Sequence, residues 1–174
     1  HNDGLNEHKD TTKLQTNETE KEVVEAEIAK SPFSIKEIVT NYLKIKNALT
    51  KDDAKTAAIA GNSLFKVMAS TNTNALTPSQ KKEYIDIVDD AKEHSEHISK
   101  NAGKIDHQRE HFAILSKDIN DLIKLLGSNK KLYQDHCPMY DDGKGAIWIS
   151  ESKEIKNPYY GSKMLTCGSL KKTL

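Results

Sequence analysis

Apolar residues recur every three or four positions in four segments between residues 34 and 126. This spacing places them on one face of an α-helix. We therefore predict helices at about 34–49, 50–69, 77–101 and 105–126. The predicted core positions are Ile35, Ile38, Val39, Tyr42, Ile45, Leu49, Ala54, Ala57, Gly61, Leu64, Phe65, Met68, Tyr84, Ile87, Val88, Ala91, Ile98, Phe112, Leu115, Ile119, Leu122 and Leu126.

Capping residues set the predicted helix ends. Thr77 and Gln80 stand at capping-box spacing, and Pro78 between them suits the first helical position. Ser34 stands three residues before a glutamate, which predicts that the first helix begins there. The second helix is predicted to begin at position 50, with Asp53 at its third helical position.

The pattern changes after residue 126. The runs 132–133 and 146–149 favour β-strands, and turn-forming Asp and Gly residues lie between them at 141–145. We predict a mostly α fold, namely an antiparallel four-helix up-down bundle with a small C-terminal β-hairpin region. Residues 31–174 form this single domain, and the polar residues 1–30 are predicted to be a flexible N-terminal tether.

Charge and hydropathy narrow the classes of function. Lys plus Arg and Asp plus Glu both number 26, so no basic excess is available for a nucleic-acid partner. No apolar run approaches the length of a membrane span, so we expect no transmembrane segment in this chain. The sequence begins with His1, from which we expect that a secretory or lipoprotein signal has been removed. The expected location is the periplasm or the outer surface, with a lipid anchor at the removed N-terminus as one form of attachment.

Sulfur-bearing side chains gather near the C-terminus. Cys137 and Met139 lie two positions apart, and Met164 and Cys167 lie three apart. Thiol and thioether ligands suit Cu(I) better than any hard cation. The alternative is a disulfide between the two cysteines, with the methionines filling the core. Such a disulfide would close a loop of about 30 residues, for roughly 3–4 kcal/mol of stabilisation. The spacing favours neither interpretation over the other.

Histidines form two pairs on the last two predicted helices. His107 and His111 are four residues apart, so they share a helix face and can hold one metal ion, although such a pair is more often a polar helix edge. We prefer His111 as the ligand because it lies closer to the core stripe. His94 and His97 form a second pair, which we assign to a solvated face because charged residues surround it. His136 adjoins the first cysteine and could contribute as a ligand, although an exposed loop histidine is the default interpretation.

Motifs of catalysis are missing from the sequence. It contains no Gly-rich phosphate loop, no Gly-x-Ser-x-Gly elbow and no His-Glu-x-x-His helix. Cys137 with a nearby histidine would lack an orienting group and an oxyanion hole, so we expect that the protein is not an enzyme. Trp148, Tyr159 and Tyr160 are expected to cover one end of the bundle.

Six segments resemble those of the bacterial domain of unknown function 3347 family: YLKIKNAL at 42–49, QREHF at 108–112, CPM at 137–139, WIS at 148–150, NPYYG at 157–161 and MLTCG at 164–168. Members of this family occur alone in exported proteins and fused to periplasmic adaptor subunits of copper and silver efflux pumps. The resemblance covers residues 33–168. It implies export and a link to copper or silver handling, but it carries no established catalytic residues.

The leading hypothesis is an exported binding module for Cu(I) or Ag(I), linked to heavy-metal handling or efflux. Its partner would be a heavy-metal efflux adaptor or another periplasmic protein. The alternative is a non-catalytic structural or protein-interaction domain stapled by a Cys137–Cys167 disulfide. The candidate ligands are Cys137, Met139, Met164 and Cys167 through sulfur, and His111 and His107 through nitrogen.

Overall fold

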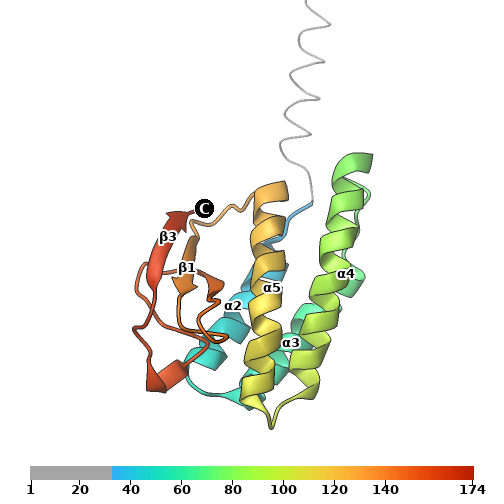
Figure 1. The fold of residues 1–174 in the computed structure, drawn as a ribbon. Helices are drawn as coiled ribbons and strands as arrows, with labels where there is room; N and C mark the ends of the chain where they lie inside the picture. The colour runs from blue at the N-terminus through green and yellow to red at the C-terminus, as the bar shows by residue number, and fades with distance from the viewer. Residues whose placement is uncertain (1–32) are drawn as a thin grey trace, which may run out of the picture. The chain divides into compact units, whose positions relative to one another are not determined.

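Four helices and a small sheet make up residues 33–174, the part of the chain that the computed structural model describes (Figure 1). This confirms the prediction of a mostly helical fold, whereas the tether predicted at 1–30 lies outside the described residues. The elements are α2 (Lys36–Thr50), α3 (Ala54–Ser70), α4 (Pro78–Lys100), α5 (Ile105–Leu126), β1 (Tyr133–Cys137), β2 (Ala146–Ser150), the short 3-10 helix η1 (Gly161–Lys163) and β3 (Ser169–Thr173).

Each helix packs against the next one along the chain. Helix α3 lies between α2 and α4, and α4 packs on α5. The sheet contacts the helices through β2, which lies against α5 and α2. Figure 1 shows the sheet and α4 on opposite sides of α5. The up-and-down order of the predicted bundle stays a prediction.

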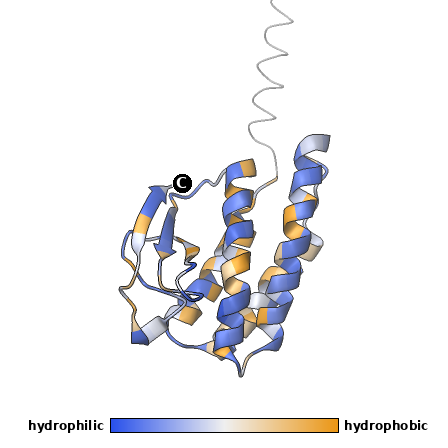
Figure 2. Cartoon of the chain, viewed as in Figure 1, coloured by the Kyte–Doolittle hydropathy of each residue, from blue (hydrophilic) through white to orange (hydrophobic). Residues whose placement is uncertain are grey.

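The core forms where the sequence pattern predicts it. Most of the predicted core positions are buried, and Tyr42, Phe112 and Leu122 are fully so. In Figure 2, hydrophobic residues recur at intervals along α4 and α5, with hydrophilic residues between them. Four predicted core positions are only partly buried, because they lie at the margins of the apolar stripes: Ala54, Phe65, Ile87 and Leu126.

Two of the predicted helix starts are corrected by the structure. The capping box of Thr77 and Gln80 forms as predicted. Helix α3, however, begins at residue 54, because Asp53 is its N-cap and accepts a hydrogen bond from the Thr56 amide at 3.0 Å. Ser34 is not an N-cap either. Its Oγ accepts from the amide two residues on, a local bond that short hydroxyl side chains form in competition with helix capping.

The predicted hairpin forms and gains a third strand. The sheet order is β2-β1-β3 with both pairings antiparallel, and His136 of β1 lies opposite Ile147 of β2. Strand β3 was not predicted, because Leu170 is its one large apolar side chain and all of its residues are exposed. It is an edge strand, and its pairing with β1 brings the preceding turn against the end of β1.

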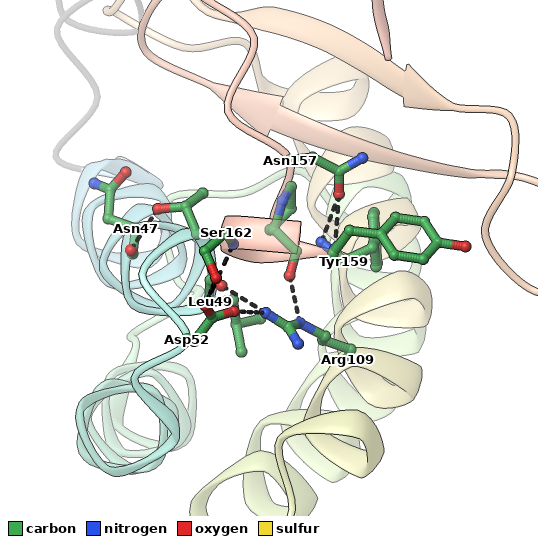
Figure 3. Close-up of polar contacts among 10 residues, drawn as sticks. Asn47, Leu49, Asp52, Arg109, Asn157, Tyr159 and Ser162 are labelled. Carbon is green, nitrogen blue, oxygen red and sulfur yellow. Dashed lines mark hydrogen bonds and ion pairs between the residues drawn. The ribbon is translucent and has the colours of Figure 1, made fainter. Parts of the chain in front are cut away.

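A buried arginine ties the C-terminal segment to the helices (Figure 3). Arg109 of α5 is 6% exposed. Its guanidinium donates to the Leu49 carbonyl at 2.9 Å, to the Asp52 carboxylate at 2.8 Å and to the Pro158 carbonyl at 2.8 Å. Ser162 also donates to the Asp52 carboxylate. Since hydrogen bonds from a charged group contribute roughly 1.5–3 kcal/mol, this network fixes the C-terminal segment on α5.

Candidate metal centre

The hairpin of α4 and α5 brings four histidines together. The two helices pack side by side and are joined by the short turn 101–104. His94 lies seven residues before that turn begins, and His111 lies seven residues after it ends. In an antiparallel pair of helices, positions at equal distances from the turn face each other, which explains why the two histidine pairs meet.

His111 is the centre of this cluster. Its Nδ1 lies 2.9 Å from Nδ1 of His94, and its Nε2 lies 3.2 Å from Nε2 of His107. The ring of His97 stacks on the His111 ring with centroids 4.3 Å apart. One ligand nitrogen from each of His97, His107 and His111 can be chosen so that all three lie within 4.8 Å of one another.

The electrostatics of the cluster favour neutral imidazole at its centre. Partial burial first, and then the charges of His97, His94 and His107, together lower the pKa of His111 to about 4. At neutral pH the His111 ring is therefore uncharged and keeps a lone pair on one nitrogen, which is the form that binds metal ions.

The spacing fits the geometry of a first-row transition metal. Zn–N bonds of about 2.0–2.1 Å in a tetrahedral site separate ligand nitrogens by about 3.3 Å, and the His107 and His111 nitrogens already lie 3.2 Å apart. His97 would turn out of its stack to bring a nitrogen to the same ion. It is exposed, so this rotation costs little packing. Three protein ligands then leave the fourth position open.

Sequence reasoning missed half of this cluster. His94 and His97 were assigned to a solvated face, but both contact the ring of His111. Their charged neighbours in sequence do point to solvent on other faces of α4, which is why the local pattern misled. The signal that would have found them is the spacing from the turn 101–104: His94 and His111 each lie seven residues away, and His97 and His107 lie four and three residues away.

The two cysteines lie together at the other side of α5. Cys137 is buried on β1, and Cys167 is partly exposed in the turn before β3. Burial raises the pKa of the Cys167 thiol, and the nearby Cys137 thiol raises it further, which indicates that the two side chains lie close together. Both thiols are free in this structure. The arrangement is compatible with a soft-metal site and with a disulfide.

The predicted meeting of the sulfur ligands with a helical histidine is not seen. Among residues 33–174, no group of three His, Cys, Asp or Glu at metal-binding distance includes a cysteine. His111 faces α4, whereas Cys137 belongs to the sheet, which packs on another side of α5. Met139 is 55% exposed in the wall of a pocket of about 460 Å³, and Met164 is partly buried. The roles of the sulfur atoms as ligands stay predictions.

Two of the three aromatic residues expected to cover the bundle pack into the core, whereas Tyr160 is partly exposed in the wall of the same pocket as Met139. Trp148 and Tyr159 are buried, with their rings 6.2 Å apart, and Tyr159 packs on Phe112 of α5. The Tyr159 hydroxyl donates to the Ile147 carbonyl. These rings join the sheet to the helices and are not available to stack on a ligand.

The fold and the cluster define the class of protein: a helical domain with a small C-terminal sheet and a surface cluster of imidazoles. The family described as "Protein of unknown function (DUF3347)" matches residues 38–131, which is more than half of the chain, and the protein belongs to this family. The match contains all four histidines of the cluster and ends before β1. No curated protein and no solved structure shows significant similarity to the chain. None of the helices in residues 33–174 combines the length and apolar character that crossing a membrane requires.

Proposed function

We propose that this protein is a transition-metal-binding module whose ion is held by His97, His107 and His111. The observation that carries the proposal is the convergence of imidazoles from two helices on one point. A histidine pair on one helix is often only a polar edge, but a third ring from a second helix adds a ligand that helix periodicity does not supply. The neutral state of His111 at physiological pH supports the same role.

Copper is the ion that we propose as the physiological cargo. Imidazole ligands suit Cu(II) and Zn(II), and they bind Cu(II) more tightly in the general affinity series of divalent metals. The choice of copper rests on the resemblance to proteins of copper and silver efflux. Export, and delivery of the ion to a heavy-metal efflux adaptor, belong to the same proposal and rest on that resemblance alone.

Exchange of the ion, and not catalysis, is the role that we propose for the site. The His107 side chain is 43% exposed, and His97 is exposed as well. The open fourth position gives a ligand of the partner a place to attack the bound ion. A catalytic site usually excludes water, which this surface position does not favour.

A metal titration tests the proposal. The wild-type chain should bind one equivalent of Cu²⁺ in competition with a chromophoric chelator. The double variant H107A/H111A should lose more than about 100-fold in affinity, equivalent to about 2.7 kcal/mol. The matched control is His136→Ala, which removes an imidazole from β1, outside the cluster. Equal affinities in the double variant and the wild type would rule out this site.

The closeness of Cys137 and Cys167 favours a second candidate function, a site for Cu(I) or Ag(I). Two adjacent thiolates can hold one soft ion, and we propose that Met139 and Met164 assist them. An anaerobic Cu(I) titration of reduced protein separates the two sites. Loss of Cu(I) binding in C137S/C167S, with Cu²⁺ binding retained, would assign the soft ion to sulfur. No difference from the wild type would reject the sulfur site.

A further inference from the structure

We infer that His94 positions the ligand His111 without itself binding the ion, and that Asp90 and Glu110 accept hydrogen bonds from the ring nitrogens of His94 and His107 that face away from the ion. This inference rests on the proposed function and deepens it. Metal-binding histidines usually donate their second ring nitrogen to a carboxylate or another acceptor, which fixes the tautomer and the ring orientation. The structure places such groups behind two of the three proposed ligands.

Glu110 stands behind His107. The Nε2 of His107 is directed at His111, while its Nδ1 lies 3.3 Å from the Glu110 carboxylate. The carboxylate therefore holds the proton on Nδ1 and leaves the Nε2 lone pair for the ion. Glu110 is only three residues away on the same helix, so it reaches the ring from the outer side of α5.

A chain of two residues stands behind His111. The Nε2 of His111 faces the metal position, and its Nδ1 lies 2.9 Å from Nδ1 of His94. The second nitrogen of His94, Nε2, lies 3.5 Å from the Asp90 carboxylate. Asp90 therefore favours the proton on Nε2 of His94, so Nδ1 of His94 is the acceptor for the N–H of His111. The hydrogen-bonded chain from His111 through His94 to Asp90 therefore fixes the His111 tautomer whose Nε2 faces the ion.

A partly buried carboxyl group, that of Asp118, lies next to this chain. Asp118 of α5 hydrogen-bonds to Asp90, and its pKa is raised to about 8 by burial first and then by that bond and the Asp90 charge. Asp118 therefore carries a proton at neutral pH and donates it to Asp90.

Both imidazole–carboxylate contacts are longer than a strong hydrogen bond of about 2.7–3.2 Å. We expect them to shorten when an ion binds, because a metal draws electron density from the ring and makes its remaining N–H more acidic. The carboxylates then raise the affinity of the ligands without touching the ion. Their removal in other metal sites costs about 10–100-fold in affinity.

Cu²⁺ affinity and the Cu²⁺ EPR spectrum of the full chain together test the inference. We compare the wild type with Asp90→Asn, His94→Ala, Glu110→Gln and the ligand variant His97→Ala. Asp90→Asn, His94→Ala and Glu110→Gln should each weaken binding by about 10–100-fold and leave the number of coordinating nitrogens unchanged. The ligand variant should instead lose one nitrogen from the spectrum. The matched control is Asp89→Asn. It removes the same charge from the residue next to Asp90, and the carboxylate of Asp89 pairs with Lys92 and not with a histidine.

The outcomes separate this inference from the function on which it rests. A wild-type chain that binds no Cu²⁺ overturns both. Normal wild-type binding with unchanged affinity in Asp90→Asn and His94→Ala overturns the inference alone. Loss of a coordinating nitrogen in His94→Ala would show that His94 is a ligand and would also overturn it. Thermal unfolding of each variant without metal identifies any general loss of fold. If the carboxylate acts on His94, Asp90→Glu should recover part of the affinity that Asp90→Asn loses.

Discussion

The protonation of His111 controls the proposed metal centre at the scale of single residues. Its ring is partly buried and touches three other histidines, so the charged form is disfavoured. Because the folded pKa is about 4 and the unfolded value about 6.5, the unfolded state binds the extra proton between these limits. Stability from this group is present above about pH 6.5 and is lost as the pH falls towards 4.

An NMR titration of the histidine ring carbons checks this account. The His111 signal should titrate with a midpoint near 4 in the wild type. In the double variant H97A/H107A the midpoint should rise, because two neighbouring positive charges are removed and the ring becomes more exposed. His136→Ala is the control and should leave the midpoint unchanged. A wild-type midpoint near 6.5 would contradict the description of the cluster.

Asp135 on β1 lowers the stability of the fold when its buried carboxylate is ionised. Its side chain is fully buried, and neither oxygen has a hydrogen-bond partner. Burial raises its pKa to about 6, against the opposing charge of Lys46. The folded pKa lies above the unfolded value, so the stabilising contribution of the neutral form is complete below about pH 4. That contribution is lost as the pH rises through 6.

The variant Asp135→Asn should therefore be more stable than the wild type at pH 7.5, by about 1–2 kcal/mol. The advantage should disappear at pH 4, where the wild-type carboxyl is itself neutral. Urea denaturation at the two pH values measures both differences. A variant that is less stable at pH 7.5 would mean that the ionised Asp135 is needed by the fold.

At the scale of elements, the close approach of α3 and α4 decides how the helices pack. Gly61 of α3 allows this contact, because a Cβ at that position would lie 3.0 Å from the Ile98 side chain and 3.0 Å from the Ser95 carbonyl oxygen of α4. Neither the backbone nor the buried side chain can move away freely. The spacing of the two helices thus depends on a single missing methyl group.

Gly61→Ala should destabilise the protein by about 1–3 kcal/mol through overpacking, even though alanine is the better helix former by about 1 kcal/mol. The matched control is Gly103→Ala in the turn before α5, where an added Cβ meets nothing within 4 Å. Thermal denaturation compares the two variants. If Gly61→Ala raised the melting temperature, the tight contact between α3 and α4 would be wrong.

Sequence patterns predicted the elements better than their contacts. The bounds predicted for α5 and the capping box of α4 are confirmed, because periodicity and capping are local properties. Strand β3 was not predicted, because an exposed edge strand does not need the alternation of apolar and polar residues that marks a half-buried strand. The histidine cluster escaped because it depends on which faces of α4 and α5 meet. A single helix pattern contains no information about that pairing.

At the scale of the whole molecule, the C-terminal segment is held by polar contacts and by one pair of sulfur atoms. Asn157 donates to the Cys167 carbonyl at 2.8 Å, and Arg109 binds the Pro158 carbonyl. The thiols of Cys137 and Cys167 lie close to each other beside these bonds. This segment therefore has few large apolar anchors apart from Tyr159, and a covalent link would add much to its stability.

Oxidation of the two thiols to a disulfide should stabilise the fold by roughly 3–4 kcal/mol, as expected for a closed loop of about 30 residues. Intact mass before and after reduction reports the state of the bond, and guanidinium denaturation of each form reports its stability. C137S/C167S serves as the control that cannot oxidise. Equal stability of the oxidised and reduced proteins would reject a structural role for the bond.

The proposed location of a metal ion depends on features at all three scales. These features are the His111 imidazole, the pairing of α4 with α5 and the separation of that pair from the sheet. X-ray absorption of the wild-type chain with one equivalent of Zn²⁺ tests it most directly. We predict a first shell with nitrogen at about 2.0–2.1 Å and no sulfur. A scatterer at about 2.3 Å, typical of a Zn–S bond, would place the ion on the cysteines and contradict the histidine centre.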